Sequence, residues 1–346
     1  MSGTSLDGVD LAEVIFSEEN DRILFKIEKT QTVPYSEEWI NRLKNGINYS
    51  EKGLKILNSE YTALLGNIIK TFISENKIEN IEAVSSHGHT ILHQPQNGFT
   101  LQIGNLPEIA QIVREKVVCD FRVQDVRLGG QGAPLVPVGD HLLFSEYDYC
   151  LNLGGFSNIS FEEKGERIAY DISPVNTVLN FYANKLGYEY DNKGEISKGG
   201  TFNQELFDQL NSLAFYDKEH PKSLGFEYVK EAIFPITENY FTQEVMRTFT
   251  EHIAFQISRN IKKLDKKQKT KVLITGGGAY NDFLISRIRY FLQNIEVVIP
   301  DKTLIEYKEA LIFALLGYLR LKNRVNILSS VTGATRNHSS GNIFDF

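Results

Sequence analysis

The sequence is poor in cysteine and contains no long apolar run. Its two cysteines in 346 residues, Cys119 and Cys150, both lie in short apolar runs without a metal-type spacing. This pattern predicts buried thiols in a reducing compartment. No apolar run reaches the ~20 residues of a membrane-spanning helix, and no charged segment followed by an apolar stretch precedes Gly3. We therefore expect a cytoplasmic protein without a membrane partner.

Basic residues are also fewer than acidic residues, 37 against 44. The net charge of -7 and the isoelectric point near 5.6 argue against nucleic acid or an anionic membrane as the main partner. Apolar residues make up 42% of the chain and charged residues 23%, which are values typical of globular proteins. The length fits two domains of ordinary size.

Two nucleotide-binding signatures are missing. The sequence contains no G-x-x-x-x-G-K-[ST], and GGGAYN does not match G-x-G-x-x-G. Three glycine turns remain: GTSLDG at 3–8, LNLGGFSN at 151–158 and LITGGGAYN at 273–281. In the first turn the hydroxyl and carboxylate groups are of the kind that hold phosphates and Mg²⁺, and glycine lets the backbone approach closely. Three such turns favour a nucleotide site.

Alternating strands and helices predict an α/β protein. In the first part we expect strands at 9–16, 22–29, 81–86, 99–104 and 116–121, a helix at 58–74 and a helix capped by Asn105. A glycine-rich connector at 127–137 then predicts a hinge or domain boundary. In the second part we expect a meander of strands at 148–153, 157–162 and 166–171, helices at 174–186, 203–214 and 240–264, and a tail with strands at 271–275 and 295–300 and helices at 281–292 and 306–321.

Polar residues near predicted strand ends are further candidates. The spacing of His87, His89 and His93 matches no known metal site, so hydrogen bonding to a substrate or a neighbouring domain is the preferred interpretation. Asp171 ends a predicted strand, where an active-site carboxylate and a helix cap are equally good interpretations. Glu309 lies near a predicted helix start, where glutamates usually complement the helix dipole.

The ordered set of motifs resembles the anhydro-N-acetylmuramic acid kinases, a family of the sugar-kinase and actin-like ATPase superfamily. The resemblance extends through nearly the whole chain. It is carried, in the family's order, by MSGTSLDGVD, SHGHTILHQP, TLQIGN, DFRVQDVRLGGQGAPLVP, NLGGFSNIS, YDISPVN, PKSLGFE, LITGGGAYN, EALIFALL and SVTGATR.

This resemblance implies a two-domain actin-like (ribonuclease H-like) ATPase fold, with mixed sheets flanked by helices and the nucleotide in the interdomain cleft. Residues 1–118 with 335–346 would form domain one, and residues 119–334 would form domain two. A homodimer is expected on the same ground. The GTSLDG turn joins the first two strands in this family. We therefore expect either a natural start upstream of Met1 or a sheet that lacks an edge segment present in relatives.

The resemblance also implies the site. Residues of two turns would bracket the ATP phosphates: Gly3, Thr4, Ser5, Asp7 and Gly8, and Gly154, Gly155 and Ser157. Gly276, Gly277, Gly278 and Asn281 would approach the adenosine. Asp171 matches the catalytic aspartate, and His87, Arg122, Gln131 and Glu309 would line or flank the sugar. No protein-held metal site is implied, although Mg²⁺ would accompany ATP and Asp7 is a candidate contact for it.

The implied reaction suits these residues. In a 1,6-anhydro sugar O6 is tied to C1, so Asp171 as general base would deprotonate a water that attacks C1. The released O6 would take the γ-phosphoryl group of ATP, which gives N-acetylmuramic acid 6-phosphate for peptidoglycan recycling.

Several positions depart from the family pattern. After its aspartate the family usually has T-G-P-G-N, whereas this chain has I-S-P-V-N at 172–176. We expect a stiffer turn, with the bulk of Val175 near the sugar. His89 replaces a usual glutamine and Asn105 a usual aspartate. The alternatives are a related sugar kinase acting on a free hydroxyl and a non-catalytic actin-like nucleotide-binding sensor. A metal-dependent hydrolase built on the three histidines ranks last.

Overall fold

The computed structural model describes residues 1–3, 6–264 and 269–346, which form two compact units. Unit 1 contains residues 1–143 and 307–346, and unit 2 contains residues 144–306. The predicted domains, residues 1–118 with 335–346 and residues 119–334, stay a prediction beside these units. Val118, Phe121 and Val138 share a core cluster with Phe313 and Ile327 of the C-terminal segment, which joins residues 119–143 to unit 1.

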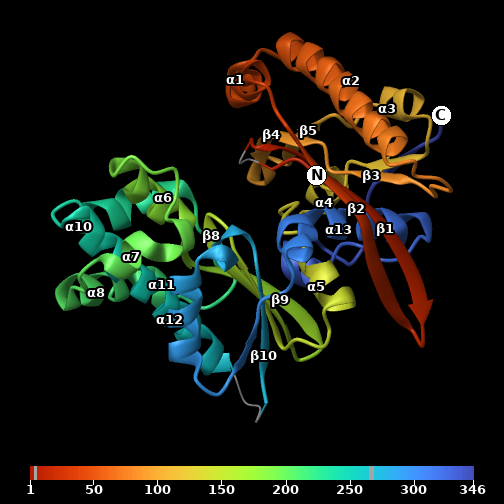
Figure 1. Cartoon of the computed structure of the whole chain (residues 1–346). Helices are drawn as coiled ribbons and strands as arrows, with labels where there is room; N and C mark the ends of the chain where they lie inside the picture. The colour runs from red at the N-terminus through yellow and green to blue at the C-terminus, as the bar shows by residue number, and fades with distance from the viewer. Residues whose placement is uncertain (4–5, 265–268) are drawn as a thin grey trace. The chain divides into compact units, whose positions relative to one another are not determined.

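Unit 1 contains small sheets and the helices around them (Figure 1). β1 pairs antiparallel with β2, β4 pairs antiparallel with β5, and β3 joins β6 and β12 in the order β12-β6-β3. The elements are β1 (Gly8–Glu19), β2 (Arg22–Pro34), α1 (Glu37–Asn45), α2 (Glu51–Glu75), β3 (Val84–Ser86), β4 (His89–Gln94), β5 (Phe99–Ile103), α3 (Glu108–Val113), β6 (Val117–Cys119), α4 (Val123–Arg127), α5 (Pro137–Leu143), α14 (Ser329–Thr332) and β12 (Asn342–Phe344). α13 (Lys302–Leu321) begins in the last residues of unit 2 and continues into unit 1.

Unit 2 is built on one mixed sheet in the order β11-β10-β7-β8-β9. β7, β10 and β11 run parallel, whereas the predicted meander of β7, β8 and β9 is antiparallel and is confirmed. The elements are β7 (Tyr149–Leu153), β8 (Phe156–Glu163), β9 (Glu166–Pro174), α6 (Asn176–Lys185), α7 (Glu195–Gly199), α8 (Gln204–Asn211), α9 (Phe226–Tyr228), a π-helical segment (Val229–Ile233), α10 (Phe234–Thr237), α11 (Thr242–Leu264), β10 (Lys271–Thr275), α12 (Asp282–Leu292) and β11 (Glu296–Val298).

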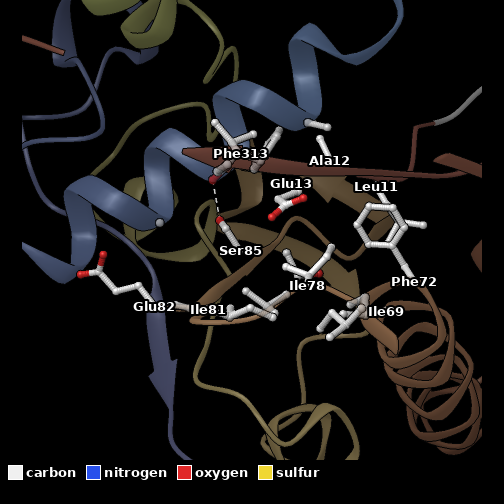
Figure 2. Close-up of a pocket in the computed structure, with 18 of the residues that line it drawn as sticks. Leu11, Ala12, Glu13, Ile69, Phe72, Ile78, Ile81, Glu82, Ser85 and Phe313 are labelled. Carbon is white, nitrogen blue, oxygen red and sulfur yellow. Dashed lines mark hydrogen bonds between the residues drawn. The ribbon is translucent and has the colours of Figure 1, made fainter. Parts of the chain in front are cut away.

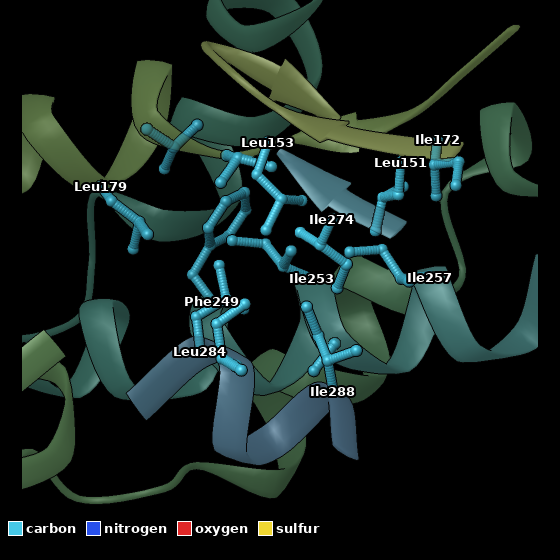
Figure 3. Packing of buried hydrophobic residues seen from close by; sticks show 14 of the residues in the cluster. Leu151, Leu153, Ile172, Leu179, Phe249, Ile253, Ile257, Ile274, Leu284 and Ile288 are labelled. Carbon is cyan, nitrogen blue, oxygen red and sulfur yellow. The ribbon is translucent and has the colours of Figure 1, made fainter. Parts of the chain in front are cut away.

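The core of unit 2 lies between this sheet and the helices α6, α11 and α12. Figure 3 shows Leu151 and Ile274 of the sheet facing Ile253 of α11, with Ile288 of α12 beyond. All four side chains are fully buried. Burying apolar side chains on this scale stabilises the sheet and fixes the directions in which its strands end. Mixed sheets flanked by helices confirm the predicted α/β class.

Two local predictions were wrong. The connector at 127–137 is no domain boundary, because it lies inside unit 1, where Gly132 donates its N–H to the buried Asp125 carboxylate. Asn105 does not cap a helix: α3 begins at Glu108, and the Asn105 amide donates instead to the carbonyl oxygens of His87 and Gln102. In both cases a tertiary hydrogen bond overrides the local signal.

Candidate active site

Asp171 lies in β9 of unit 2, opposite Asn158 of β8 and next to a register shift between these strands. Its Oδ2 accepts a hydrogen bond of 2.8 Å from the backbone N–H of Leu224, and its own N–H donates to the carbonyl of Lys222 at 3.1 Å. Burial raises the pKa of the Asp171 carboxyl, and the Leu224 N–H partly opposes the rise. The carboxylate is therefore held in one direction and is a better base than an exposed aspartate.

Sequence reasoning missed the role of Leu224. Its segment belongs to the PKSLGFE motif, so the motif order gave the one available signal that this loop matters. A backbone N–H donor leaves no mark in residue type, because every residue except proline carries one. The pairing of this loop with β9 appears only in the fold.

The glycine pair at 154–155 turns β7 into β8 and holds the start of α6. Gly155 is exposed, and its carbonyl accepts hydrogen bonds from Val175 N–H (2.8 Å) and Thr177 N–H (3.1 Å). A Cβ at Gly155 would lie 2.8 Å from Thr177 Oγ1, so a side chain there would push against α6. Glycine is therefore required at position 155, because Thr177 of α6 lies too close for a side chain there. The turn follows the carboxyl end of β7.

The second glycine turn of unit 2 lies at the same sheet edge. β7 and β10 are parallel, so residues 154–155 and 276–278 both leave the sheet at its carboxyl edge, where open α/β sheets bind ligands. Gly276 has φ +83°, and a Cβ there would lie 2.4 Å from Asn152 Oδ1. Gly277 is exposed. Asp171 belongs to β9 of the same sheet, so the structure brings these predicted residues together within unit 2.

Three predicted residues of unit 2 have structural roles. The Ser157 hydroxyl is fully buried, where it accepts the N–H of Ser173 at 3.1 Å. Asn281 caps α12 by accepting the N–H of Leu284 at 2.9 Å. Contact of Ser157 or Asn281 with nucleotide stays a prediction. Val175 is fully buried in the core of unit 2, and its place near the sugar stays a prediction.

The GTSLDG turn of unit 1 is described in part, because Thr4 and Ser5 lie outside the described residues. Gly8 begins β1, and a Cβ there would lie 2.3 Å from the carbonyl oxygen of Val33 in β2. This glycine is therefore required by the strand pairing itself. Asp7 next to it is exposed, and Gly3 accepts a 3.4 Å hydrogen bond from the N–H of Leu6.

Buried His87 and half-buried Arg122 form a hydrogen-bonded pair in unit 1. Arg122 Nε donates to His87 Nε2 at 2.9 Å, and Arg122 Nη1 donates to the Gly132 carbonyl at 2.5 Å. Burial and the Arg122 cation lower the pKa of His87 well below its usual range. His87 is therefore neutral, with its Nδ1 proton directed to the Gly88 carbonyl at 3.1 Å. This arrangement fixes the guanidinium of Arg122.

Glu309 and Gln131 complete the predicted sugar-side set in unit 1. Glu309 keeps contact with solvent, yet desolvation by the surrounding protein raises its pKa, and Arg122 is the main group that opposes the rise. The Gln131 side chain is exposed, while its backbone N–H donates to the Thr332 carbonyl at 2.8 Å. His87, Arg122 and Glu309 thus belong to one electrostatic group.

Asp125 holds the loop that carries Gln131, and sequence reasoning missed it. Its buried carboxylate accepts the N–H of Gly132 and the hydroxyl of Thr332, each at 2.7 Å. A Cβ at Gly130 would lie 2.2 Å from this carboxylate, which explains a glycine at that position. Thr332 is distant in sequence, so the clamp could not be inferred from spacing.

The other two histidines have separate partners. His89 is buried, its Nδ1 lies 2.8 Å from Ser2 Oγ, and burial lowers its pKa to about 4. His93 Nδ1 lies 3.0 Å from Thr100 Oγ1. Within the described ranges no group of three or more histidine, cysteine, aspartate or glutamate side chains is arranged to hold a metal ion. The same residues contain no helix long and apolar enough to cross a membrane.

The residues at the unit 2 sheet edge fit a phosphate-bearing ligand. The exposed backbone of Gly155 and Gly277 leaves room that a side chain would fill, at the end of parallel strands and beside the start of α6. These glycines would hold ATP through backbone groups.

Comparisons with known proteins show the family of the chain. The model of the family described as anhydro-N-acetylmuramic acid kinase matches residues 1–345. The relative of that name from Mannheimia succiniciproducens is 34% identical over 99% of this chain and 97% of its own length. That from Haemophilus influenzae is 32% identical over 99% and 96%. Among solved structures, the activator of the 2-hydroxyisocaproyl-CoA dehydratase from Clostridium difficile is 16% identical over 48% of this chain and 59% of its own, with a TM-score of 0.32. On the full-length sequence matches, the chain belongs to the anhydro-N-acetylmuramic acid kinase family.

Proposed function

We propose that this protein is an ATP-dependent kinase that opens the 1,6-anhydro ring of anhydro-N-acetylmuramic acid with water and phosphorylates O6. The product is N-acetylmuramic acid 6-phosphate, which returns cell-wall sugar to metabolism. The full-length family match supports the substrate, and the oriented Asp171 carboxylate is the single observation that supports the mechanism.

Asp171 is the general base. Its carboxylate accepts a proton from water while the water oxygen forms a bond to C1 and the C1–O6 bond breaks. ATP supplies the γ-phosphoryl group that O6 receives as ADP leaves. Asp171 suits this role because the Leu224 N–H fixes one carboxylate oxygen at 2.8 Å and leaves the other to contact water. Its raised pKa makes proton acceptance more favourable.

The unit 1 group orients the sugar. Burial lowers the pKa of Arg122 to about 10, so its guanidinium remains charged at neutral pH. His87 and Gly132 hold this cation in place, and Glu309 supplies a carboxylate nearby. A fixed cation and a carboxylate suit the carboxyl and hydroxyl groups of a muramic acid derivative.

The finer assignments follow the same proposal. Mg²⁺ accompanies ATP, and Asp7 is its protein contact. The other glycine-turn residues hold the nucleotide as predicted. The protein works in the cytoplasm as a homodimer on a small sugar, with neither nucleic acid nor membrane as partner. These assignments rest on family membership and on the composition of the chain.

The first test is a coupled ATP-turnover assay with 1,6-anhydro-N-acetylmuramic acid, beside free N-acetylmuramic acid and N-acetylglucosamine. With the anhydro sugar as substrate, the expected product is heavier than that sugar by one water and one phosphoryl group. Mass spectrometry would detect this difference. Phosphorylation of a free sugar alone would contradict the proposal and indicate a kinase of a free hydroxyl. ATP binding without turnover of any sugar would indicate a sensor.

The second test removes the base. Asp171→Asn keeps the side-chain oxygen that accepts the Leu224 N–H but cannot take up a proton, so turnover should fall at least ~100-fold while ATP binding persists. Asp217→Asn is the matched control, because Asp217 is exposed and pairs with Arg259 in the same unit. Turnover of Asp171→Asn within a few-fold of the control would rule out the assignment.

A further inference from the structure

Four polar side chains form a hydrogen-bonded network inside unit 1. They come from separate segments and are all buried: Ser2, Tyr35 after β2, Tyr61 of α2 and His89 at the start of β4. The Tyr61 and Tyr35 hydroxyl oxygens lie 2.6 Å apart. Ser2 Oγ lies 2.7 Å from the Tyr35 hydroxyl and 2.8 Å from His89 Nδ1. We call these four residues the hydroxyl network.

The protons of this network point toward His89. The Tyr61 hydroxyl is fully buried and bonded to Tyr35, so its proton goes to the Tyr35 oxygen. Tyr35 then donates to Ser2, and Ser2 donates to His89 Nδ1, because each hydroxyl carries one proton. Burial lowers the pKa of His89 to about 4, so its ring is neutral at pH 7. Its single proton is therefore on Nε2.

Ser2 connects the hydroxyl network to both predicted ligand groups of unit 1. It directly precedes Gly3, the first residue of the turn predicted to hold the ATP phosphates. Its backbone also hydrogen-bonds the ring of His87. His87 Nε2 in turn accepts a hydrogen bond of 2.9 Å from Arg122 Nε. A shift of Ser2 would therefore disturb the nucleotide turn and the Arg122 cation together.

The two tyrosines give the hydroxyl network a rigid end. Tyr35 and Tyr61 belong to the apolar core of unit 1, in one cluster with Leu11 and Phe72. Figure 2 shows the ring of Phe72 of α2 beside Leu11 of β1. Close packing of this kind leaves buried rings little room to move. Ser2 is thus held between a fixed tyrosine hydroxyl and the ring of His89.

We propose that His89 is a positioning residue, whose Nδ1 accepts the Ser2 hydroxyl and thereby fixes the start of the first glycine turn for the ATP phosphates. Packing alone does not require these contacts, since apolar side chains of similar shape could fill the same space at little cost. Hydrogen bonds add one defined place for Ser2, and phosphoryl transfer depends on such positioning. This inference rests on the proposed function, which makes ATP the ligand of the turn.

The main test measures the Kd of ATP by calorimetry, which needs no sugar. Ser2→Ala and His89→Leu should each weaken ATP binding at least ~5-fold, the usual worth of one hydrogen bond. His89→Asn keeps an acceptor for the Ser2 hydroxyl and should restore most of the affinity. His93→Leu is the matched control with unchanged Kd, because His93 is exposed in the same strand and contacts Thr100 instead. If Ser2→Ala and His89→Leu lower Tm yet bind ATP as the wild type does, the proposal is overturned.

Two further measurements make the result specific. NMR of the histidine ring nitrogens at neutral pH should show His89 as the Nε2–H tautomer, assigned by its loss in His89→Asn; the Nδ1–H tautomer would overturn Nδ1 as the acceptor. Ser2→Ala with His89→Leu should bind ATP about as weakly as either single variant, because both remove one contact, and additive losses would contradict this. Failure of the wild type to bind ATP would refute the proposed function as well, whereas normal wild-type binding with unchanged affinity in Ser2→Ala would refute the positioning role alone.

Discussion

Asp171 shows how two local contacts set the ionisation of one side chain. Burial raises its pKa and the Leu224 N–H lowers it, with burial the larger effect. Only the ionised carboxylate accepts a proton, so kcat/KM should fall as pH drops through this raised pKa. We expect the acid limb of the pH profile to lie above 3.8, the ordinary value for aspartate. A limb at or below 3.8 would argue against Asp171 as the base.

Asp120 offers a stability test at the same scale. Burial raises its pKa to about 6, from an ordinary 3.8, so the stability it contributes in acid is lost as pH rises through about 6. Asp120→Asn is neutral throughout, keeps an acceptor for the Asn342 amide and tolerates the positive φ of 60°. We expect it to gain about 1–2 kcal/mol in free energy of unfolding at pH 8 and nothing near pH 4. Urea titrations at both pH values measure this, and an equal gain at both would contradict the linkage.

At the residue scale, sequence reasoning found the groups with distinctive chemistry and missed those that position them. Asp171 and the glycines at 154–155 and 276–278 carried signals of residue type and spacing, and the fold brings them to one sheet of unit 2. The Leu224 N–H and the Asp125 clamp carried none, because their partners are far away in the chain. The burial of Val175 in the core of unit 2 was not predicted, because the direction of a side chain at a strand end depends on the core that packs against it.

The hairpin of β8 and β9 is held at its open end by a hydroxyl bridge. Ser157 Oγ accepts the N–H of Ser173, and both residues are fully buried. Ser157→Ala would leave this N–H without its acceptor, so the free energy of unfolding should fall by about 1–3 kcal/mol. ATP affinity should change little if the role is structural. Exposed Ser286 in α12 is a control site whose alanine variant should lose less than ~0.5 kcal/mol. A large loss of ATP affinity without loss of stability would instead support phosphate contact.

Most elements were predicted to within a few residues, and the misses have physical causes. The antiparallel meander, β10 and the long helices carried clear periodicity. The strand expected at 81–86 is paired only from Val84 to Ser86, and among the described strands it pairs with β6 alone. α13 begins at Lys302, earlier than expected, since Asp301 accepts the N–H of Leu304 at 2.8 Å. This places Glu309 in the helix interior rather than at its start.

Across the whole molecule, a buried ion pair ties the C-terminal part of unit 1 to its N-terminal part. Lys308 of α13 lies 2.7 Å from Asp140 of α5, and both side chains are almost fully buried. Lys308→Met should cost about 3–5 kcal/mol in free energy of unfolding, because it removes the cation that compensates a buried carboxylate. Lys308→Met with Asp140→Leu should recover much of this loss. The exposed pair of Lys55 and Glu51 is the control, and Lys55→Met should cost less than ~0.5 kcal/mol. Equal losses for Lys308→Met and Lys55→Met would contradict the role of burial.

Unit 1 is assembled from both ends of the chain, whereas unit 2 is one continuous stretch. During synthesis, residues 144–306 are made before the segment 307–346. Phe313, Leu316 and Ile327, which share a core cluster with Val118, therefore arrive late in synthesis. Domains generally fold as units as they emerge. Unit 2 should thus become protease-resistant on stalled ribosomes first, and unit 1 only after release of the C-terminus.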